Sequence, residues 1–571
     1  MLHFSCHDCG VVVTGTTRMQ IEKLFDRSDL KGLSFDGLVS WWVGSRDGNR
    51  LRNRILVGLL LLVCLATAIV AVPRLEIFGH DFFISLDGGW RVLHGQRPGV
   101  DFYSQMGPAY YLLHAAGLWL AGGDAQGLGY GSALATSLIS FWAFLLLRSR
   151  MRPAPLFIAC LFLALLAAAP FPLGYHFFQA SFSMKHNRYG YALTALVMLE
   201  SFLPQDDSTR KQNFLGGFST GLACALLLFL KISYGFVALT FAAVSLPLRS
   251  GIRSRLAGMA GGFAAFTVPM MAYLRFDLPS QISQYELLAR AQGHRISLHT
   301  IISCVYRERL DIALVVLLAA LLILLRGVSR RRSFTLMLAV MMAIGAGTLL
   351  MLTNTQLTDV PLLGAAALLL LNEVTVAIPE GSVLPQAAPL LAMGLLAVGL
   401  PMCVDAAGLA VAMEHKALPG NSSYHFREAQ LASIAFADCP APSIVYQPCS
   451  LNDNGQNFVR YTEEGIALVQ AYGRPGESVR GMGMSNPFSF ATQRPPSHGG
   501  AVNLSKTNIP RSFMPPKKFL IGDADLLLVP KFPATERDIL AAILQSYPEL
   551  LGTDYLPVAE SENWILYRRA K

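Results

Sequence analysis

Residues 55–72 read ILVGLLLLVCLATAIVAV, an apolar run that contains no charged residue. A run of this length crosses the roughly 30 Å hydrocarbon layer of a bilayer as a helix. Arginines crowd against its start, at positions 46, 50, 52 and 54. Because basic residues gather on the cytoplasmic side of a span, residues 1–54 are predicted to form a cytoplasmic N-terminal segment.

Apolar runs of similar length recur along the rest of the chain. Of its 571 residues, 53% are hydrophobic and only 15% are charged, which is too few charges to cover a soluble protein of this size. The sequence therefore predicts an all-α polytopic membrane bundle with about eleven transmembrane helices. The net charge of +9 is interpreted as asymmetry between the loops, and not as nucleic-acid binding. After the first run, the predicted spans are residues 128–147, 155–169, 189–202, 214–230, 236–248, 256–273, 310–325, 334–352, 361–376 and 390–408.

The basic residues of the loops decide how these spans are oriented. Residues 108–120 are apolar but short, and they carry Tyr110, Tyr111 and Trp119, which favour the membrane interface. If they form a juxtamembrane helix in the first periplasmic loop, with Pro108 in its first turn, all dense basic clusters fall on the cytoplasmic side. These clusters are Arg148/Arg150/Arg152, Arg210/Lys211, Arg249/Arg253/Arg255 and Arg330/Arg331/Arg332.

The odd number of spans places residues 411–571 outside, beyond a transmembrane module of residues 55–410. This C-terminal part is rich in Pro, Asn, Ser and Gly, and it predicts a small α/β domain on the outer side of the membrane. Cys439 and Cys449 flank a strand-like run, and a disulfide between them is compatible with an oxidising compartment. The predicted strands are residues 443–446, 519–521, 526–529 and 564–567, and the predicted helices are residues 426–436, 465–472 and 536–547.

Polar residues at the outer ends of the spans form the candidate site. Acids at a bilayer face are costly to desolvate, so they are more often functional than incidental. Outer loops converge above a bundle, where an acid with several cations suits a lipid-linked phosphosugar. Arginine and lysine would hold its phosphate, and a carboxylate would deprotonate the attacking hydroxyl. The catalytic candidates are Asp81 and Asp101, and the substrate-binding candidates are Arg91, Lys185, Arg188, Lys231, Tyr234, Gln356 and Asp359.

These candidates also have structural interpretations. Asp81 could cap a helix, and Asp101 could form a salt bridge with Arg91 or Arg97. Long cations at the ends of spans commonly snorkel to the headgroups. The polar residues that precede Pro361 could cap the next helix. We favour catalysis for Asp81 and a structural role for Asp101.

The loop that follows the first span carries a resemblance to a known family. It reads HDFFISLDGGWRVLHG at residues 80–95 and DFYSQMGPAYYLL at residues 101–113. An Asp opens the loop, and an Arg-containing amphipathic segment, an aromatic cluster and a Pro-led juxtamembrane helix follow. This order resembles the first periplasmic loop of GT-C type glycosyltransferases, in the branch of lipid A aminoarabinose transferases, protein O-mannosyltransferases and rhizobial galacturonosyltransferases. The resemblance covers about residues 55–400.

The resemblance implies roles for individual residues. Asp81 falls on the family's catalytic aspartate, which implies that it is the general base or orients the acceptor. Lys231 and Arg188 correspond to basic residues that contact the polyprenyl phosphate. The position after Asp81 is Phe82, where the family commonly has Glu. Because one carboxylate is a weak site for a hard cation, no cofactor is certain, and a dependence on a divalent cation stays open.

Together these observations predict a membrane glycosyltransferase, and the resemblance implies that it lies in the bacterial inner membrane with its C-terminal α/β domain in the periplasm. It would move a sugar from a polyprenyl-phosphate donor to a periplasmic envelope glycan, lipid or protein, with membrane lipids and no nucleic acid among its partners. The chain lacks GxxxxGK[ST] and GxGxxG phosphate-binding units, which argues against a nucleotide-driven pump or a nucleotide-sugar enzyme. Two alternatives stay open. One is a transporter or flippase of lipid-linked sugars, which would need polar helices at the midplane, and the other is a non-catalytic envelope assembly protein.

Overall fold

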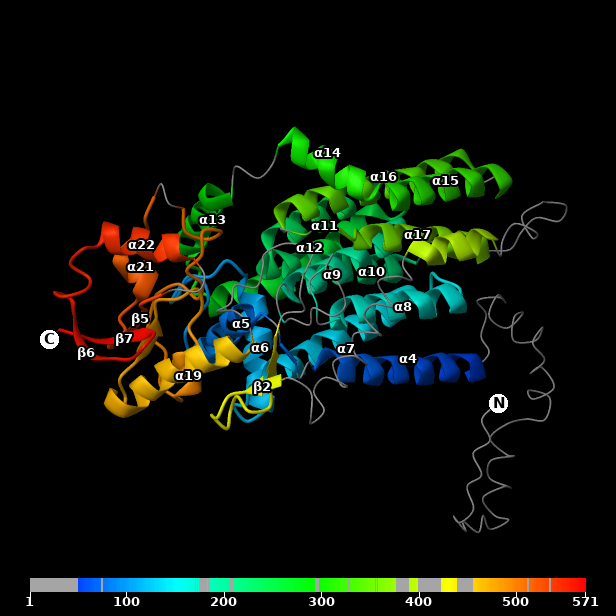
Figure 1. The fold of residues 1–571 in the computed structure, drawn as a ribbon. Coiled ribbons are helices and arrows are strands. Elements are labelled where there is room, and N and C mark those ends of the chain that lie inside the picture. Colours follow the sequence, from blue (N-terminus) through cyan, green and yellow to red (C-terminus); the bar gives the residue numbers. More distant parts are fainter. Residues whose placement is uncertain are drawn as a thin grey trace, which may run out of the picture.

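Helices dominate the chain, and strands occur in the C-terminal part and in one short stretch of the first loop (Figure 1). The predicted strand at residues 443–446 and the pair Cys439–Cys449 lie outside the described residues. The computed structural model describes residues 50–72, 75–76, 78–169, 171, 173, 182, 185–204, 209–292, 297–326, 329–354, 356, 358–375, 390–398, 423–438, 455–510, 513–532 and 536–570.

The membrane part is a bundle of helices that lie side by side in Figure 1. In the described part of the chain, four helices are long and apolar enough to cross a membrane: α7 (Gly127–Leu147), α10 (Arg210–Leu230), α12 (Ile252–Tyr273) and α16 (Arg330–Thr353). The predicted helical bundle is confirmed, whereas the count of eleven spans stays a prediction. The other helices of the bundle are α4 (Arg50–Ala71), α8 (Pro153–Ala168), α9 (Lys185–Phe202), α11 (Ile232–Ser245) with the 3-10 turn η1 (Leu246–Leu248), α15 (Arg309–Arg326), α17 (Pro361–Thr375) and residues 390–398.

Local sequence explains two of the helix starts and one break. α10 follows a capping box, in which Thr209 and Gln212 each accept a hydrogen bond from the other's backbone N–H. α6 (Pro108–Leu120) has Pro108 in its first turn, and it has the predicted bounds. Lys231, with φ −164°, is extended and separates α10 from α11.

Two helices of the first loop cover one end of the bundle, which we call the outer end because it carries the C-terminal part (Figure 1). These are α5 (Gly79–Leu93) and α6, and they pack closely on each other. A Cβ on Gly88 would come within 2.0 Å of Tyr111 Cε1, so this approach requires glycine. α13 (Leu278–Gln292) and α14 (Leu298–Arg307) complete this end.

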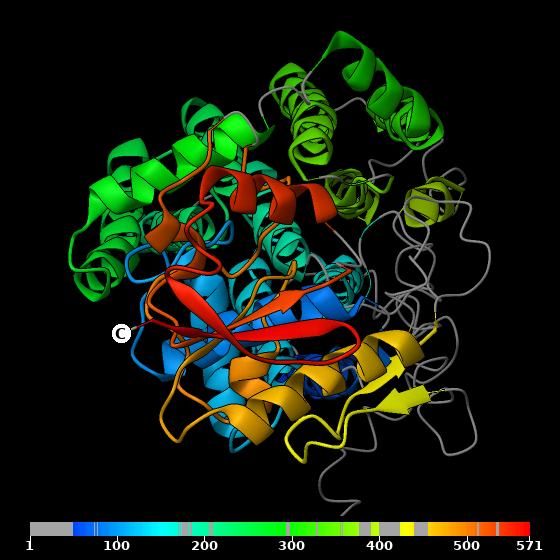
Figure 2. The same cartoon turned by 60° about the vertical axis from the view of Figure 1, so that its left-hand side comes forward.

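The C-terminal part contains a four-stranded sheet in the order β4–β5–β7–β6 (Figure 2). β4 pairs in parallel with β5, and β7 pairs antiparallel with β5 and β6. The predicted strands at 526–529 and 564–567 and the predicted helices at 465–472 and 536–547 are confirmed. The elements are α19 (Gly455–Tyr472), β4 (Val479–Gly481), α20 (Phe488–Ala491), α21 (Lys517–Ile521), β5 (Leu526–Pro530), α22 (Arg537–Ser546), β6 (Tyr555–Glu560) and β7 (Trp564–Arg569).

Two predictions for this part are wrong. Residues 519–521 lie in α21, a short helix that begins after Pro516 and ends at Gly522, whose φ is 70°. Such a proline start and glycine end favour one helical turn over a strand. Residues 426–436 form turns that lead into β3 (Ala435–Ala437), because β3 pairs with strands on both of its sides.

The first loop and the C-terminal part share a sheet and a hydrophobic core. β1 (Leu75–Glu76) pairs in parallel with β3, and β2 (Ser423–His425) pairs antiparallel with it. Phe83 of α5 stacks on Phe436 with ring centroids 6.2 Å apart, and both rings contact Phe458. Burying such rings together is the main stabilising contribution to this contact. α5 is therefore fixed between the bundle and the C-terminal sheet.

The inner end of the bundle, opposite to the C-terminal part, is held by buried charges. Glu200 of α9 is fully buried and pairs with Arg150, at 2.8 Å, and with Arg255. Thr220 Oγ1 donates to the same carboxylate at 2.8 Å. A second pair, Arg332–Glu373, joins α16 to α17. Each arginine that faces Glu200 thus finds its counter-charge in the chain itself.

Candidate active site

Asp81 lies in the first turn of α5, at the outer end of the bundle, with a half-buried side chain. One turn along the same helix, the Ser85 hydroxyl forms a 2.8 Å hydrogen bond with the Tyr110 hydroxyl of α6. Burial raises the pKa of Tyr110 well above its ordinary value, and the nearby charge of Asp81 adds to this. α5 and α6 therefore bring an acid and a buried phenol together at this end.

Two predicted cations, Lys185 and Arg188, lie in the first turn of α9, and both are buried. Lys185 Nζ donates to the carbonyl oxygens of Ala167, at 3.0 Å, and Ala168, at 2.6 Å. Arg188 donates to backbone carbonyls, and its guanidinium carbon lies 4.3 Å from the centre of the Phe171 ring. Their charges lie close enough to repel each other. Both cations thus face neutral groups.

Lys231, at the break between α10 and α11, joins this group. Its Nζ donates to Asn187 Oδ1 at 2.9 Å and lies 3.3 Å from His186 Nε2. The His186 ring lies 5.6 Å from the Tyr110 ring, so the lysine is linked to the α5–α6 pair. Burial lowers the pKa of Lys231 to about 7.

The counter-charge of these cations is incomplete. Within the described residues, Lys185, Arg188 and Lys231 form no ion pair with a carboxylate. Asp359 acts on Arg188 through its charge, without direct pairing. Arg188 Nη2 and His186 Nδ1 are buried and have no hydrogen-bond partner among the residues that the structure describes. Because a buried polar or charged group without a partner costs free energy, this cluster is incomplete until an anion or acceptor reaches it. We call Lys185, His186, Arg188 and Lys231 the outer cation cluster.

A network of neutral polar groups borders the outer cation cluster. The Tyr191 hydroxyl donates to Gln356 Oε1 at 2.9 Å, and the Tyr191 and Tyr234 rings lie 5.1 Å apart. Asn354 donates to the Tyr234 hydroxyl at 3.0 Å, while its own Oδ1 is buried without a partner. The structure thus brings the predicted residues Tyr234 and Gln356 together.

Asp359 closes this network from the loop before α17. Its φ is 67°, an unusual value for a residue with a side chain, and Gln356 donates to its carbonyl oxygen. Its backbone N–H donates to Glu308 Oε1 at 3.0 Å. Burial, together with the charge of Asp359, raises the pKa of Glu308 to about 7. In the part of the chain that the structure describes, no three potential metal ligands lie together.

Arg91 lies apart from this site, in the contact between α5 and the C-terminal part. It is fully buried and pairs with Asp87 at 2.8 Å. Its other donors reach the carbonyl oxygens of Ser497 and Gly499, both at 2.8 Å. Asn486 donates to the second oxygen of Asp87 at 3.0 Å. These contacts occupy the guanidinium and fasten α5 to the C-terminal domain.

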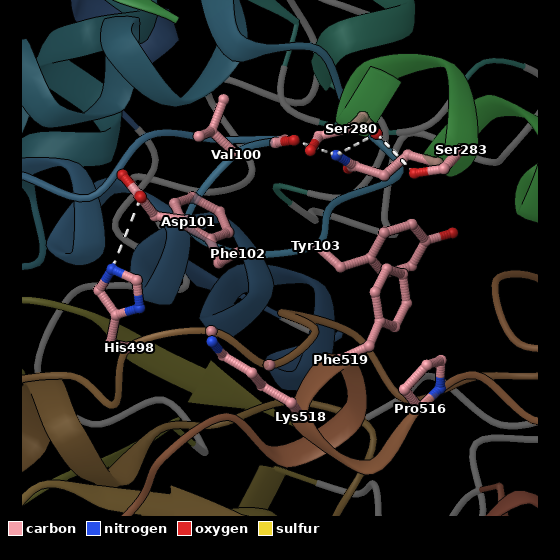
Figure 3. Close-up of a pocket in the computed structure, with 14 residues that line it drawn as sticks. Val100, Asp101, Phe102, Tyr103, Ser280, Ser283, His498, Pro516, Lys518 and Phe519 are labelled. Carbon is pink, nitrogen blue, oxygen red and sulfur yellow. Dashed lines mark hydrogen bonds and ion pairs between the residues drawn. The ribbon is translucent and has the colours of Figure 1, made fainter. Parts of the chain in front are cut away.

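Asp101 also lies outside the outer cation cluster, on the rim of a pocket of ≈ 320 Å³ (Figure 3). It accepts 2.7 Å and 2.8 Å hydrogen bonds from the side chain and the backbone of Arg97, and His498 lies 3.5 Å away. Burial alone would raise the pKa of Asp101, but the bonds and charge of Arg97 hold it below its ordinary value. The salt bridge with Arg97 was one of the two predicted for this residue.

Tyr110 and Glu308 were not predicted as members of the site, and His186 and Asn354 were considered among the polar residues at the outer ends of the spans but were not selected as substrate-binding candidates. Tyr110 was interpreted as an interfacial ring, yet it is fully buried beside Ser85. His186 stands between two predicted cations, and this position was a usable signal. Glu308 is distant in sequence from the loop before α17 and approaches it only in the folded chain. No local sequence pattern therefore indicates that Glu308 belongs to the site.

Comparisons with known proteins add a weak likeness. No protein-family model matches the chain, and no curated protein matches it. Three of the solved structures that are similar to it belong to GT-C superfamily glycosyltransferases, the family that the first-loop pattern resembles. All three fall below a TM-score of 0.5, so the likeness carries no argument for the function of this chain.

The three structures differ in how much of each chain is matched. ArnT from Cupriavidus metallidurans, bound to undecaprenyl phosphate, is 13% identical with a TM-score of 0.47, over 90% of this chain and 97% of that one. The archaeal oligosaccharyltransferase AglB from Archaeoglobus fulgidus is 13% identical with a TM-score of 0.37, over 84% and 70%. The arabinofuranosyltransferase AftD from Mycobacteria is 12% identical with a TM-score of 0.43, over 91% and 40%.

Proposed function

We propose that the chain is an inner-membrane glycosyltransferase that takes a sugar from a polyprenyl-phosphate donor. The observation that carries the proposal is the outer cation cluster, whose lysines and arginine form no ion pair with a carboxylate among the described residues. An anion that enters the cluster would supply the missing charge. The phosphate of a lipid is such an anion, and the cluster lies at an end of the bundle, where headgroups would lie.

In this proposal Lys231 and Arg188 bind the donor phosphate. Lys231 is the more accessible of the two, and Arg188 retains a free donor at Nη2. Their positive charge stabilises the phosphate that leaves with the electron pair of the broken bond. Charge stabilisation of this kind is often the largest single contribution to catalysis. Lys185, bound to two carbonyl oxygens, adds to the field without a direct contact.

Asp81 acts as the general base. Its carboxylate takes the proton of an acceptor hydroxyl while the hydroxyl oxygen attacks the anomeric carbon. The bond between that carbon and the phosphate oxygen breaks, which gives a glycosylated acceptor and a free polyprenyl phosphate. The half-buried position of Asp81 at the start of α5 supports this role, since a general base must be within reach of its substrate.

The other predicted site residues receive different roles. Tyr234, Gln356 and Asp359 position Arg188 through the polar network, and Asp101 and Arg91 are structural. The donor is proposed to bind on the periplasmic side, and the acceptor is a glycan, lipid or protein of the envelope. The C-terminal domain lies on the same side, because it adjoins α5.

The test is the substitution Asp81→Asn in the purified full chain. We expect unchanged expression and thermal unfolding, with sugar transfer reduced by about 10²- to 10⁴-fold, the range for loss of a general base. Glu286→Gln, on the exposed side of α13, is the matched control and should keep its activity. Near-normal transfer by Asp81→Asn would remove the proposed mechanism.

The same preparation distinguishes glycosyl transfer from the alternative functions in transport or assembly. Transfer in detergent micelles requires no membrane gradient, so its presence excludes a role restricted to transport. Its absence with every polyprenyl-phosphate sugar tested, in a folded protein, would favour the two alternatives.

A further inference from the structure

Two neighbouring hollows on the outer side of the molecule share part of their lining. The first, of ≈ 320 Å³, lies between the first loop, α13 and the C-terminal domain (Figure 3). The second, of ≈ 700 Å³, lies between α21, β6 and β7. His498 and Lys518 line both hollows. We call the combined feature the outer groove; its size is in the range of sites that hold small ligands.

The outer groove offers the partly exposed ring of Phe519, which is backed by the buried ring of Tyr103, next to polar groups. The Tyr103 and Phe519 rings lie 4.2 Å apart at an angle of 39°, and Figure 3 shows them together at one wall of the first hollow. The Tyr103 hydroxyl donates to the Asn508 carbonyl oxygen at 3.2 Å, which fixes the ring. Ser280 and Ser283 of α13 add hydroxyls on the opposite wall. Fixed rings beside hydroxyls suit a ligand with both C–H faces and O–H groups.

The charges of the outer groove are mixed in sign. Asp101 is held by Arg97, and Lys517 is held by Glu549 and Asp554. Lys518 is exposed and forms no ion pair among the described residues. The mixed signs argue against a polyanion, which would favour a groove of one sign. They also do not indicate an extended peptide, which commonly adds to an exposed strand edge. Mixed donors and acceptors suit the hydroxyls of a saccharide.

The outer groove is connected to the catalytic side of α5 through a short chain of contacts. Tyr103 is followed by Ser104, whose hydroxyl donates to the Tyr111 hydroxyl at 2.8 Å. The Tyr111 ring lies 5.4 Å from the Tyr110 ring, and Tyr110 bonds Ser85 on α5. A ligand seated in the groove therefore contacts the loop that supports α6 and Tyr110.

We propose that the outer groove binds the saccharide portion of the acceptor, so that the acceptor is a glycan of the cell envelope. This inference rests on the proposed function, because only a glycosyltransferase has an acceptor. Saccharide binding itself can be measured without transfer. One sugar ring would pack on Phe519, whose ring is held in place by the buried Tyr103 ring. Lys518 and His498, which line both hollows, would bind hydroxyls of the next unit.

The test uses lipopolysaccharide purified from a strain that lacks this protein, immobilised and presented to the full chain in detergent. The Asp81→Asn variant should bind it as the wild type does. The double variant Lys518→Ala/His498→Ala should bind at least tenfold more weakly, and both residues are exposed, so folding is preserved. Lys506→Ala, an exposed lysine outside the groove, should bind normally. The delipidated saccharide should compete.

Kinetics separate this proposal from the proposed function. With transfer established, the double variant should raise the acceptor KM about tenfold and leave kcat within about twofold, the signature of lost ground-state binding. If Asp81→Asn keeps transferring, the catalytic mechanism fails while the groove still stands on its binding data. Three results would overturn the proposal that the groove binds a saccharide. These are unchanged binding by the double variant, lack of competition by the saccharide, and capture of lipopolysaccharide through its lipid alone.

Discussion

The two ends of the helical bundle treat buried charge in opposite ways. At the inner end, Glu200 meets Arg150 and Arg255 in direct ion pairs, and Arg332 meets Glu373. At the outer end, the outer cation cluster relies on carbonyl oxygens, an amide and a histidine. The difference distinguishes structural charges from a binding site. Charges that are paired within the chain hold helices together, whereas cations without an ion-pair partner can bind an anionic ligand.

The same side-chain types therefore have different expected effects when they are substituted. Removing one partner of a buried ion pair leaves the other charge uncompensated and is strongly destabilising. Removing a buried cation that has no ion-pair partner relieves a desolvation cost and affects binding instead. The inner end can therefore be tested by stability, which substitutions at the outer end should not lower. The outer end can be tested by ligand binding and transfer.

The largest effect is expected at the inner end. Glu200→Gln would leave Arg150 and Arg255 buried without their counter-charge, with a loss of about 3–5 kcal/mol in stability. Thermal unfolding of the purified protein in detergent measures this. Arg427→Ala, which removes an exposed pair with Glu463 at 3.6 Å, is the control and should cost less than about 1 kcal/mol. A Glu200 variant as stable as this control would end the distinction between the two ends.

At the outer end, Lys231→Gln should lower transfer by about 10²-fold, because the leaving phosphate loses a cation. The ligand-free protein should unfold at the same temperature or higher, since no ion pair is broken. Lys231→Arg keeps the charge and should retain most of the activity. A marked fall in stability with Lys231→Gln would instead assign this lysine to the fold.

The pH dependence of the outer end has a definite sign. Lys231 has a pKa of about 7 in the folded chain, below the ordinary value of about 10.4 in the unfolded chain. Between these values the unfolded chain binds more protons, so the ligand-free protein should become more stable as pH rises. Affinity for an anionic lipid should fall about tenfold from pH 7 to 8.5 as the charge is lost. Lys231→Arg should flatten both curves, and identical curves in that variant would contradict the assignment.

The smallest effect is expected for Asp101. Its carboxylate is bound by Arg97, so Asp101→Asn should leave kcat at saturating acceptor within about threefold of the wild type. Steady-state kinetics at high acceptor concentration provide the measurement. A loss comparable to that of Asp81→Asn would restore Asp101 as a catalytic residue.

Much of the architecture could be predicted because it is encoded locally. Pro108 and the aromatic residues after it predict α6, and short strand-like apolar runs predict β5 and β7. Lys185, Arg188 and Lys231 were identified by their position at the ends of apolar runs. Such signals depend on neighbours within one helix or strand.

What could not be predicted depends on contacts between distant residues. β1 pairs with β3 across some 360 positions, as Leu75 faces Ala435, and no pattern in either segment indicates the other. Arg91 looks like a phosphate ligand in the loop, but the carbonyl oxygens of Ser497 and Gly499 occupy it. Whether a cation is paired is decided by the fold, and not by its own neighbourhood.

The central claim is that the outer cation cluster binds a lipid phosphate, and it is tested most directly by ligand-induced thermal stabilisation. Undecaprenyl phosphate should raise the unfolding temperature of the wild-type chain, whereas the neutral alcohol undecaprenol should not. Arg188→Gln/Lys231→Gln should lose the phosphate-dependent shift, and Glu286→Gln should keep it. Equal stabilisation by the neutral alcohol, or a full shift in the double variant, would contradict the account.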